Sequence, residues 1–70
     1  MANFILKNTI KVERAKKDLT QEALAQLVGV TRKTINSIER GNYVPSTLLS
    51  LKIARVFGAR FEDVFFLAGE

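Results

Sequence analysis

Apolar residues recur every three or four positions along most of this sequence, a spacing that places them on one face of an α-helix. The pattern predicts five helices, at Thr9–Lys17, Gln21–Val28, Arg32–Arg40, from the cap Ser46 through about Phe57, and Phe61–Phe65. In the second helix, Leu24, Leu27 and Val28 fall at i, i+3 and i+4 and mark the expected buried face. The predicted fold class is therefore all-α, with one domain over residues 1–70 and its core at about 7–65.

The breaks between these helices carry residues that start or stop a helix. Thr20, Thr31 and Ser46 stand where a side-chain oxygen can cap the first turn of the following helix. Gly29 and Gly41 stand at the ends of the second and third helices, where glycine accepts a left-handed backbone. Two short helices joined by a turn that contains glycine are the outline of a helix-turn-helix.

The segment from Gln21 to Glu39 also meets the packing demands of that unit. Ala25 is small at the point where the two helices cross, and Gly29 can adopt the positive φ of a tight turn. The positions that must face the other helices are all apolar: Leu24, Val28, Val30, Ile35 and Ile38. A small helical bundle of another kind could carry the same pattern, so the alternative stays open at this point.

Two apolar triplets lie outside the predicted helices, Phe4-Ile5-Leu6 and Phe66-Leu67-Ala68. On a lone chain of 70 residues they would expose an apolar patch of a kind that soluble monomers usually avoid. Both triplets suit β structure, so we expect a small antiparallel β element near the twofold axis of a dimer. The alternative is two frayed ends. The large apolar side chains expected at the dimer interface are Phe4, Leu6, Phe61, Phe65, Phe66 and Leu67.

Positive charge is concentrated in the first part of the chain. The net charge is +4, and residues 1–40 alone hold eight Lys and Arg against four Asp and Glu. This asymmetry favours a polyanionic partner, nucleic acid before a membrane surface. No apolar run approaches the ~20 residues that cross a bilayer. No signal peptide is recognisable either, so we expect a cytoplasmic protein.

The chain has no Cys and no His. Their absence from the sequence excludes disulfides, metal sites built from thiolates or imidazoles, and catalysis by a nucleophile paired with His. Glu62 and Asp63 are adjacent on a short predicted helix and point apart, which does not suit paired acid–base work. We therefore expect no metal, no cofactor and no enzymatic activity.

Four short motifs occur in the order typical of one family. They are Thr20-Gln21-Glu22-Ala23-Leu24-Ala25, Gly29-Val30-Thr31-Arg32-Lys33-Thr34-Ile35, Ile38-Glu39-Arg40-Gly41 and Tyr43-Val44-Pro45-Ser46. From about Ile10 to Phe65 the chain strongly resembles the phage-repressor/Cro-like helix-turn-helix family, also called the XRE family. It looks most like the compact single-domain members of the cytolysin-operon repressor type. The resemblance implies a repressor-like domain that binds specific sequences of double-stranded DNA as a homodimer, most often as a transcriptional repressor at an inverted-repeat operator.

The resemblance also implies which residues meet DNA. The third helix would enter the major groove with its N-terminal turn leading, Arg32 or Lys33 donating to guanine and Asn36 pairing with adenine. Gln21, at a helix N-terminus, could contact a phosphate or brace a base-reading side chain. The expected DNA-contacting residues are Gln21, Thr31, Arg32, Lys33, Thr34, Asn36, Ser37, Arg40, Asn42 and Tyr43. The alternative is an ordinary solvated polar face.

An ion pair between Arg14 and Glu39 is implied in the same way, holding the third helix to the first. Leu48 departs from the family pattern, because relatives commonly carry an acid there, and it shares a helix face with charged residues. An exposed Leu48, together with Phe66, would suit a second function, that of an antitoxin-like or co-regulator module that binds another protein. The operator, the sign of regulation and the identity of any protein partner do not follow from the sequence.

Overall fold

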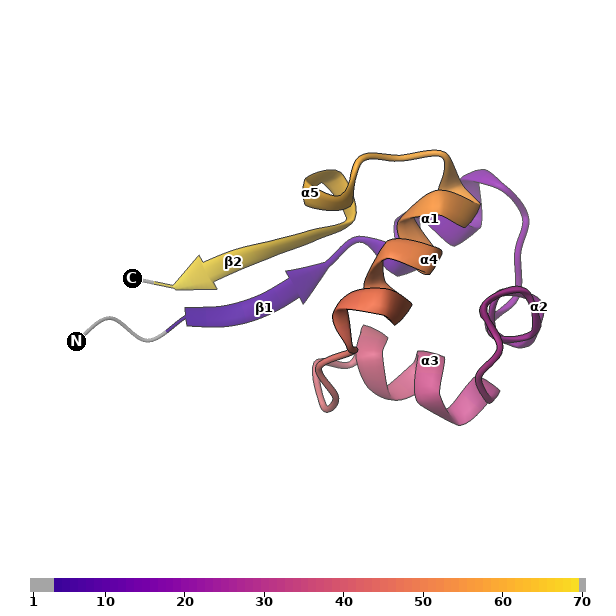
Figure 1. Ribbon diagram of the computed structural model, residues 1–70, viewed down its shortest axis with the longest axis horizontal. Helices are drawn as coiled ribbons and strands as arrows, with labels where there is room; N and C mark the ends of the chain where they lie inside the picture. Colours follow the sequence, from indigo (N-terminus) through magenta and orange to yellow (C-terminus); the bar gives the residue numbers. More distant parts are fainter. Residues whose placement is uncertain (1–3, 70) are drawn as a thin grey trace.

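The computed structural model describes residues 4–69, so residues 1–3 and 70 of the predicted domain lie outside the described part. Five helices form one body, and two terminal strands form a ribbon that projects from it (Figure 1). In chain order the elements are β1 (Phe4–Asn8), α1 (Ile10–Lys16), α2 (Gln21–Val28), α3 (Arg32–Glu39), α4 (Thr47–Phe57), α5 (Phe61–Val64) and β2 (Phe65–Gly69). The prediction of a five-helix fold with a small β element from the two ends is confirmed.

The ribbon is an antiparallel pair formed within the chain. Phe4 lies opposite Gly69, and Asn8 lies opposite Phe65. The base of the ribbon is tied to the helical body through Asn8, whose Nδ2 donates to the carbonyl oxygen of Ile38 at 3.0 Å. These bonds join residues that are far apart in the chain, so the two terminal segments are paired strands. The alternative of two frayed ends, which the sequence left open, is excluded for the described residues.

The core collects apolar side chains from every helix and from the first residue of β2. Its members are Ile10, Leu24, Ala25, Val28, Ile35, Ile38, Leu49, Ile53, Ala54, Phe57, Val64 and Phe65. The positions predicted to lock the helix-turn-helix onto the other helices are among them, and Val30 packs against the same cluster. Each large side chain buried in this way contributes about 1.5–3 kcal/mol to folding. Burial therefore holds α2 and α3 in place relative to the rest of the chain.

Leu27 corrects one prediction, because its side chain is 62% exposed. The buried stripe of α2 consists of Leu24, Ala25 and Val28. Successive residues turn by about 100° around a helix, which puts Leu27 roughly 110° from the middle of that stripe. The i, i+3, i+4 pattern alone had placed it on the wrong side.

Phe65 corrects a second prediction. It begins β2 instead of ending the fifth helix, and it is only 3% exposed because it packs into the core of its own chain. A side chain already covered in this way has almost no surface to offer to a second copy. Phe65 is therefore removed from the expected dimer interface.

The predicted caps form, and they set the start of each helix in the helix-turn-helix. Thr20 Oγ1 accepts from the backbone N–H of Ala23 at 2.9 Å, and Thr31 Oγ1 accepts from that of Thr34 at 3.2 Å. Gly29 ends α2 with a left-handed backbone at φ +80°. Caps and glycine together fix the direction in which α3 leaves the turn.

We expect Gly29→Ala to lower the free energy of unfolding by roughly 1–2 kcal/mol, the cost of a left-handed backbone for a residue with a Cβ. An added Cβ would meet no atom within 4 Å, so this cost is purely conformational. Urea unfolding measures it. Gly29→Asn is the control, because asparagine tolerates this conformation better, and equal stability of all three proteins would contradict the explanation.

Candidate nucleic-acid interface

Helix α3 has one buried face and one polar face. Ile35 and Ile38 are buried in the core, while Arg32, Lys33 and the adjoining Arg40 are exposed. Glu39 is the acidic residue of this helix, and its side chain is 8% exposed and paired with Arg14. The solvent-facing side of α3 therefore carries two cations, and a third follows at its C-cap, with no exposed acid on the same helix. This arrangement suits a polyanion.

One flank of α3 forms a polar stripe against the start of α2. Arg32, Asn36 and Glu39 follow at i, i+4 and i+7, and Gln21 reaches all three from the first position of α2. Gln21 Nε2 donates to Asn36 Oδ1 and to Glu39 Oε1, both at 3.2 Å. Arg32 Nη1 donates to Gln21 Oε1 at 3.4 Å. This hydrogen-bonded group ties the two helices of the helix-turn-helix together at the protein surface.

The stripe continues inward to α1 through the ion pair that the resemblance implied. Arg14 Nε lies 2.7 Å from Glu39 Oε2, and Arg14 Nη2 lies 3.1 Å from Glu39 Oε1. The third donor, Nη1, bonds the carbonyl oxygen of Leu19 at 2.9 Å. The hydrogen bond to Glu39 raises the pKa of Arg14 although burial acts to lower it, and the charge of the carboxylate adds to the rise. The guanidinium of Arg14 is therefore held in its charged form.

The other flank of α3 borders a shallow hollow. Its lining residues come from α3 and from the chain segments just before and after it: Thr31, Lys33, Thr34, Ser37, Asn42 and Tyr43. These side chains are polar or amphipathic, and Tyr43 is half exposed. With Gln21, Arg32 and Asn36 on the first flank and Arg40 at the end of the helix, all ten expected DNA-contacting residues lie on or beside α3.

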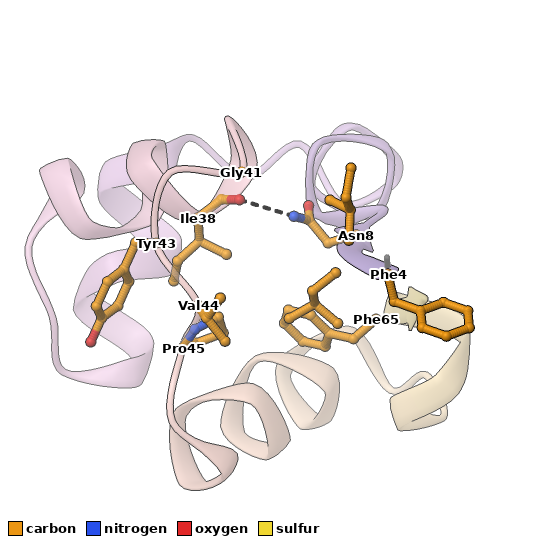
Figure 2. Close-up of a pocket in the computed structure, with 10 residues that line it drawn as sticks. Phe4, Asn8, Ile38, Gly41, Tyr43, Val44, Pro45 and Phe65 are labelled. Atoms are coloured by element: carbon orange, nitrogen blue, oxygen red, sulfur yellow. Dashed lines mark hydrogen bonds between the residues drawn. The ribbon is translucent and has the colours of Figure 1, made fainter. Parts of the chain in front are cut away.

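Figure 2 shows a second hollow, of about 230 Å³, between β1 and the loop that follows α3. Val44 and Pro45 line it on one side, and Phe4 and Phe65 line it on the other. Its polar Asn8 is already used in the hydrogen bond to Ile38. The hollow is thus an apolar surface without an obvious reactive group.

Comparison with known proteins agrees with this geometry. A family model described as helix-turn-helix, HTH_3, matches residues 10–64. The chain belongs to this helix-turn-helix family of DNA-binding transcriptional regulators. The match runs from the first residue of α1 through the last residue of α5, so the whole helical body lies within the family domain.

Individual relatives extend the likeness over most of the chain. An uncharacterized HTH-type transcriptional regulator of Bacillus subtilis, YgzD, is 51% identical over 65 residues, covering 93% of this chain and 98% of its own. An uncharacterized HTH-type regulator of Archaeoglobus fulgidus is 53% identical over 60 residues, covering 86% and 84%. The restriction-modification controller protein C.AhdI of Aeromonas hydrophila is 31% identical, with a TM-score of 0.72 over 77% of this chain and 82% of its own.

Membership in this HTH_3 family agrees with the prediction that the chain is not an enzyme, since these relatives are named as regulators of transcription. Among residues 4–69, no cluster of three or more acidic, His or Cys side chains could hold a metal ion. Within the same residues, no helix is both long enough and apolar enough to cross a membrane.

The sequence did not indicate the contact between Gln21 and Glu39. Glu39 was expected to pair with Arg14 alone, yet it also accepts a hydrogen bond from Gln21. The available signal was the i, i+4, i+7 spacing of Arg32, Asn36 and Glu39, which puts all three on one side of α3. The spacing alone does not show that Asn36 turns its side chain toward Gln21, since the same position also suits an outward-facing residue.

Proposed function

We propose that this regulator reads specific double-stranded DNA sequences with α3 and binds an inverted-repeat operator as a homodimer, acting as a repressor by occupying it. The observation that carries the proposal is the division of α3 into a core face and a cationic polar face. An α-helix with its side chains is about 10–12 Å across, which fits the roughly 12 Å width of the major groove. Because Ile35 and Ile38 are buried, the polar face is the one available to bases.

Phosphate contacts would come from the surroundings of α3. The backbone N–H groups at the start of α2 and the exposed cation Arg40 can meet the DNA backbone. Asn42 and Tyr43, on the other flank of α3, can meet it as well. Such contacts carry little sequence information but release counterions. We therefore expect the affinity for any duplex to fall steeply as the salt concentration rises.

Exposed apolar side chains on the ribbon support the homodimer. Residues paired across an antiparallel ribbon share a face, so Ile5 and Phe66 lie on the face opposite Leu6 and Phe65. On the second face, Leu6 and Phe65 pack against the core of their own chain, so Leu6 has little surface for a second copy, while Ile5 and Phe66 stay exposed on the first face. A two-stranded ribbon alone is only marginally stable in water, and a second copy would cover these side chains. Phe4, Leu67 and Phe61 are exposed as well and are proposed to join the interface.

An exposed apolar pair on α4 favours a second candidate function, binding of another protein. Leu48 is 65% exposed, as expected from its departure from the family pattern, and Leu51 is exposed one turn further along α4. Their i, i+3 spacing forms a small patch on one helix face. A chain that selects no duplex sequence but binds a protein partner one-to-one would support this second function over the first.

Substitution of Arg32 tests base reading. We expect Arg32→Ala to cost about 1–3 kcal/mol of binding free energy at one base pair of the operator and to relax the preference there. Titration against duplexes changed one base pair at a time measures the effect. Arg55→Ala is the control, because it removes one exposed arginine from α4 and should leave every preference intact. Uniform weakening of all duplexes by Arg32→Ala would mean that Arg32 contacts the DNA backbone instead.

A further inference from the structure

Helix α4 carries a stripe of exposed residues on the side opposite the core. Its four members follow at i, i+3, i+4 and i+7 and therefore share one face of the helix: Leu48, Leu51, Lys52 and Arg55. The buried residues of α4 lie on the other face, and they are Leu49, Ser50, Ile53, Ala54 and Phe57. We call the four exposed residues the α4 stripe. It extends about 10 Å along the helix axis.

The α4 stripe has an apolar half and a cationic half. Leu48 is 65% exposed and Leu51 is 49% exposed, and they lie about one turn apart. Lys52 and Arg55 follow toward the end of the helix, and α4 contains no acidic residue. Among residues 4–69, neither of these two cations has an ion-pair partner. A surface that covers the stripe gains both by burying apolar area and by supplying carboxylates.

The stripe is separate from the surface proposed to read DNA. None of its residues lines the hollow beside α3, whose walls come from α3 and the chain segments next to it. Figure 1 shows α3 along the lower side of the helical body and α4 above it. The polar face of α3 and the α4 stripe are therefore two distinct surfaces of the same small domain.

Charge distinguishes between the possible occupants of the stripe. A second copy of this chain is a poor match, because the chain has a net charge of +4. Acidic residues do lie beside the exposed Phe61 on α5, but Glu62 and Asp63 already pair with Arg60 at 3.3 and 3.6 Å. Duplex DNA supplies negative charge, yet its outer surface is a row of phosphates that buries no leucine side chain. The remaining match is a protein surface that is both acidic and apolar.

We propose that the α4 stripe docks an acidic amphipathic segment of another protein. Its apolar side chains cover Leu48 and Leu51, and its carboxylates pair with Lys52 and Arg55. An amphipathic helix with apolar residues three or four positions apart and acids one turn further along fits this spacing. The inference rests on the second candidate function, protein binding through the apolar pair on α4, and it is independent of base reading by α3.

Selection from a library of random peptides by the purified full-length protein is the experiment. Peptides about 16 residues long can form four helical turns. The enriched peptides should combine leucine or aromatic residues with Asp and Glu at helical spacing, and a synthetic copy of the most enriched one serves as the probe. Leu48→Asp should weaken binding of this probe by a factor of about 10 or more, and Arg55→Glu by about threefold or more. A probe with Lys in place of its acids should prefer Arg55→Glu to the wild type.

Two matched variants on α1 control for these changes. Val12→Asp and Lys11→Glu introduce the same charges at exposed positions away from the stripe and should leave the affinity for the probe unchanged. Thermal unfolding of every variant identifies the ones that fold. If Leu48→Asp does not fold, Leu51→Gln replaces it as the test of the apolar half.

The outcomes separate this inference from both proposed functions. An acidic probe that is weakened by the stripe variants and not by the α1 variants supports it. Enriched peptides that bind the stripe variants as well as the wild type would overturn it and leave protein binding at another surface, while no enriched peptide at all would overturn the second candidate function too. Dissociation of the dimer by Leu48→Asp would assign the stripe to a second copy, and uniform loss of duplex affinity in Arg55→Glu would assign it to DNA. Either result overturns the inference, and neither bears on the base preference of α3.

Discussion

Arg14→Met will lower the free energy of unfolding by about 3–5 kcal/mol, because it leaves the buried carboxylate of Glu39 without its charged partner. A chain of this size has a total stability of only about 4–10 kcal/mol, so the loss is a large part of it. Urea unfolding followed by circular dichroism gives the value. The hydrogen bond from Gln21 remains in the variant but carries no full charge.

Two comparisons separate this effect from the loss of any surface cation. Lys16→Met removes an exposed lysine from the same helix, one that pairs with Glu13 at 3.2 Å, and should cost less than about 1 kcal/mol. The double variant Arg14→Met/Glu39→Leu should recover most of the lost stability, because apolar side chains of similar volume can replace a buried pair. An Arg14→Met protein as stable as Lys16→Met would contradict a buried, structural role.

Phe66→Asp will shift the proposed dimer toward monomers. Each dimer holds two copies of Phe66, each 41% exposed in the single chain, and covering that area is worth about 2 kcal/mol in total. Burying two carboxylates instead adds a further penalty. The association constant should therefore fall by a factor of about 30 or more, as measured by sedimentation equilibrium. DNA affinity should fall too, because a monomer engages one half-site, while the preference among half-sites survives.

Two variants control for damage within the chain itself. Leu67→Asp changes a more exposed ribbon side chain and should also weaken the dimer, with less effect on the fold of the monomer. Leu48→Asp introduces the same charge on α4 and should leave the dimer intact. If both ribbon variants stay dimeric and Leu48→Asp does not, the interface lies on α4 and α5.

Local signals explain why the helices could be predicted from the sequence. Thr20 and Thr31 cap the helices that follow them, and Gly29 ends α2, all through bonds within a few residues of chain. Leu27 was misplaced because the spacing of apolar residues is compatible with more than one buried side of a short helix. The packing of Leu24 and Val28 against the rest of the core determines which side of α2 is buried.

Contacts between distant residues could be predicted only in part. The apolar ends suggested a ribbon, but its register joins residues 4–8 to residues 65–69, and no local pattern specifies it. The burial of Phe65 follows from that register, since Phe65 pairs with Asn8 at the base of the ribbon. The contacts of the Gln21 side chain are a further example, because its Nε2 donates to Asn36 and Glu39 on a different helix. These contacts can be recognised only in the folded structure, where Asn36 and Glu39 lie next to Gln21.

Selection of bound sequences from random duplex DNA by the purified protein tests the proposed operator recognition most directly. The expected result is one enriched inverted repeat, with half-site centres about one helical turn, or roughly 34 Å, apart. At the positions where Arg32 and Asn36 reach the major groove, we expect bases whose edges present hydrogen-bond acceptors. Recovery of no enriched sequence, or of single asymmetric half-sites alone, would contradict recognition of an operator by a dimer.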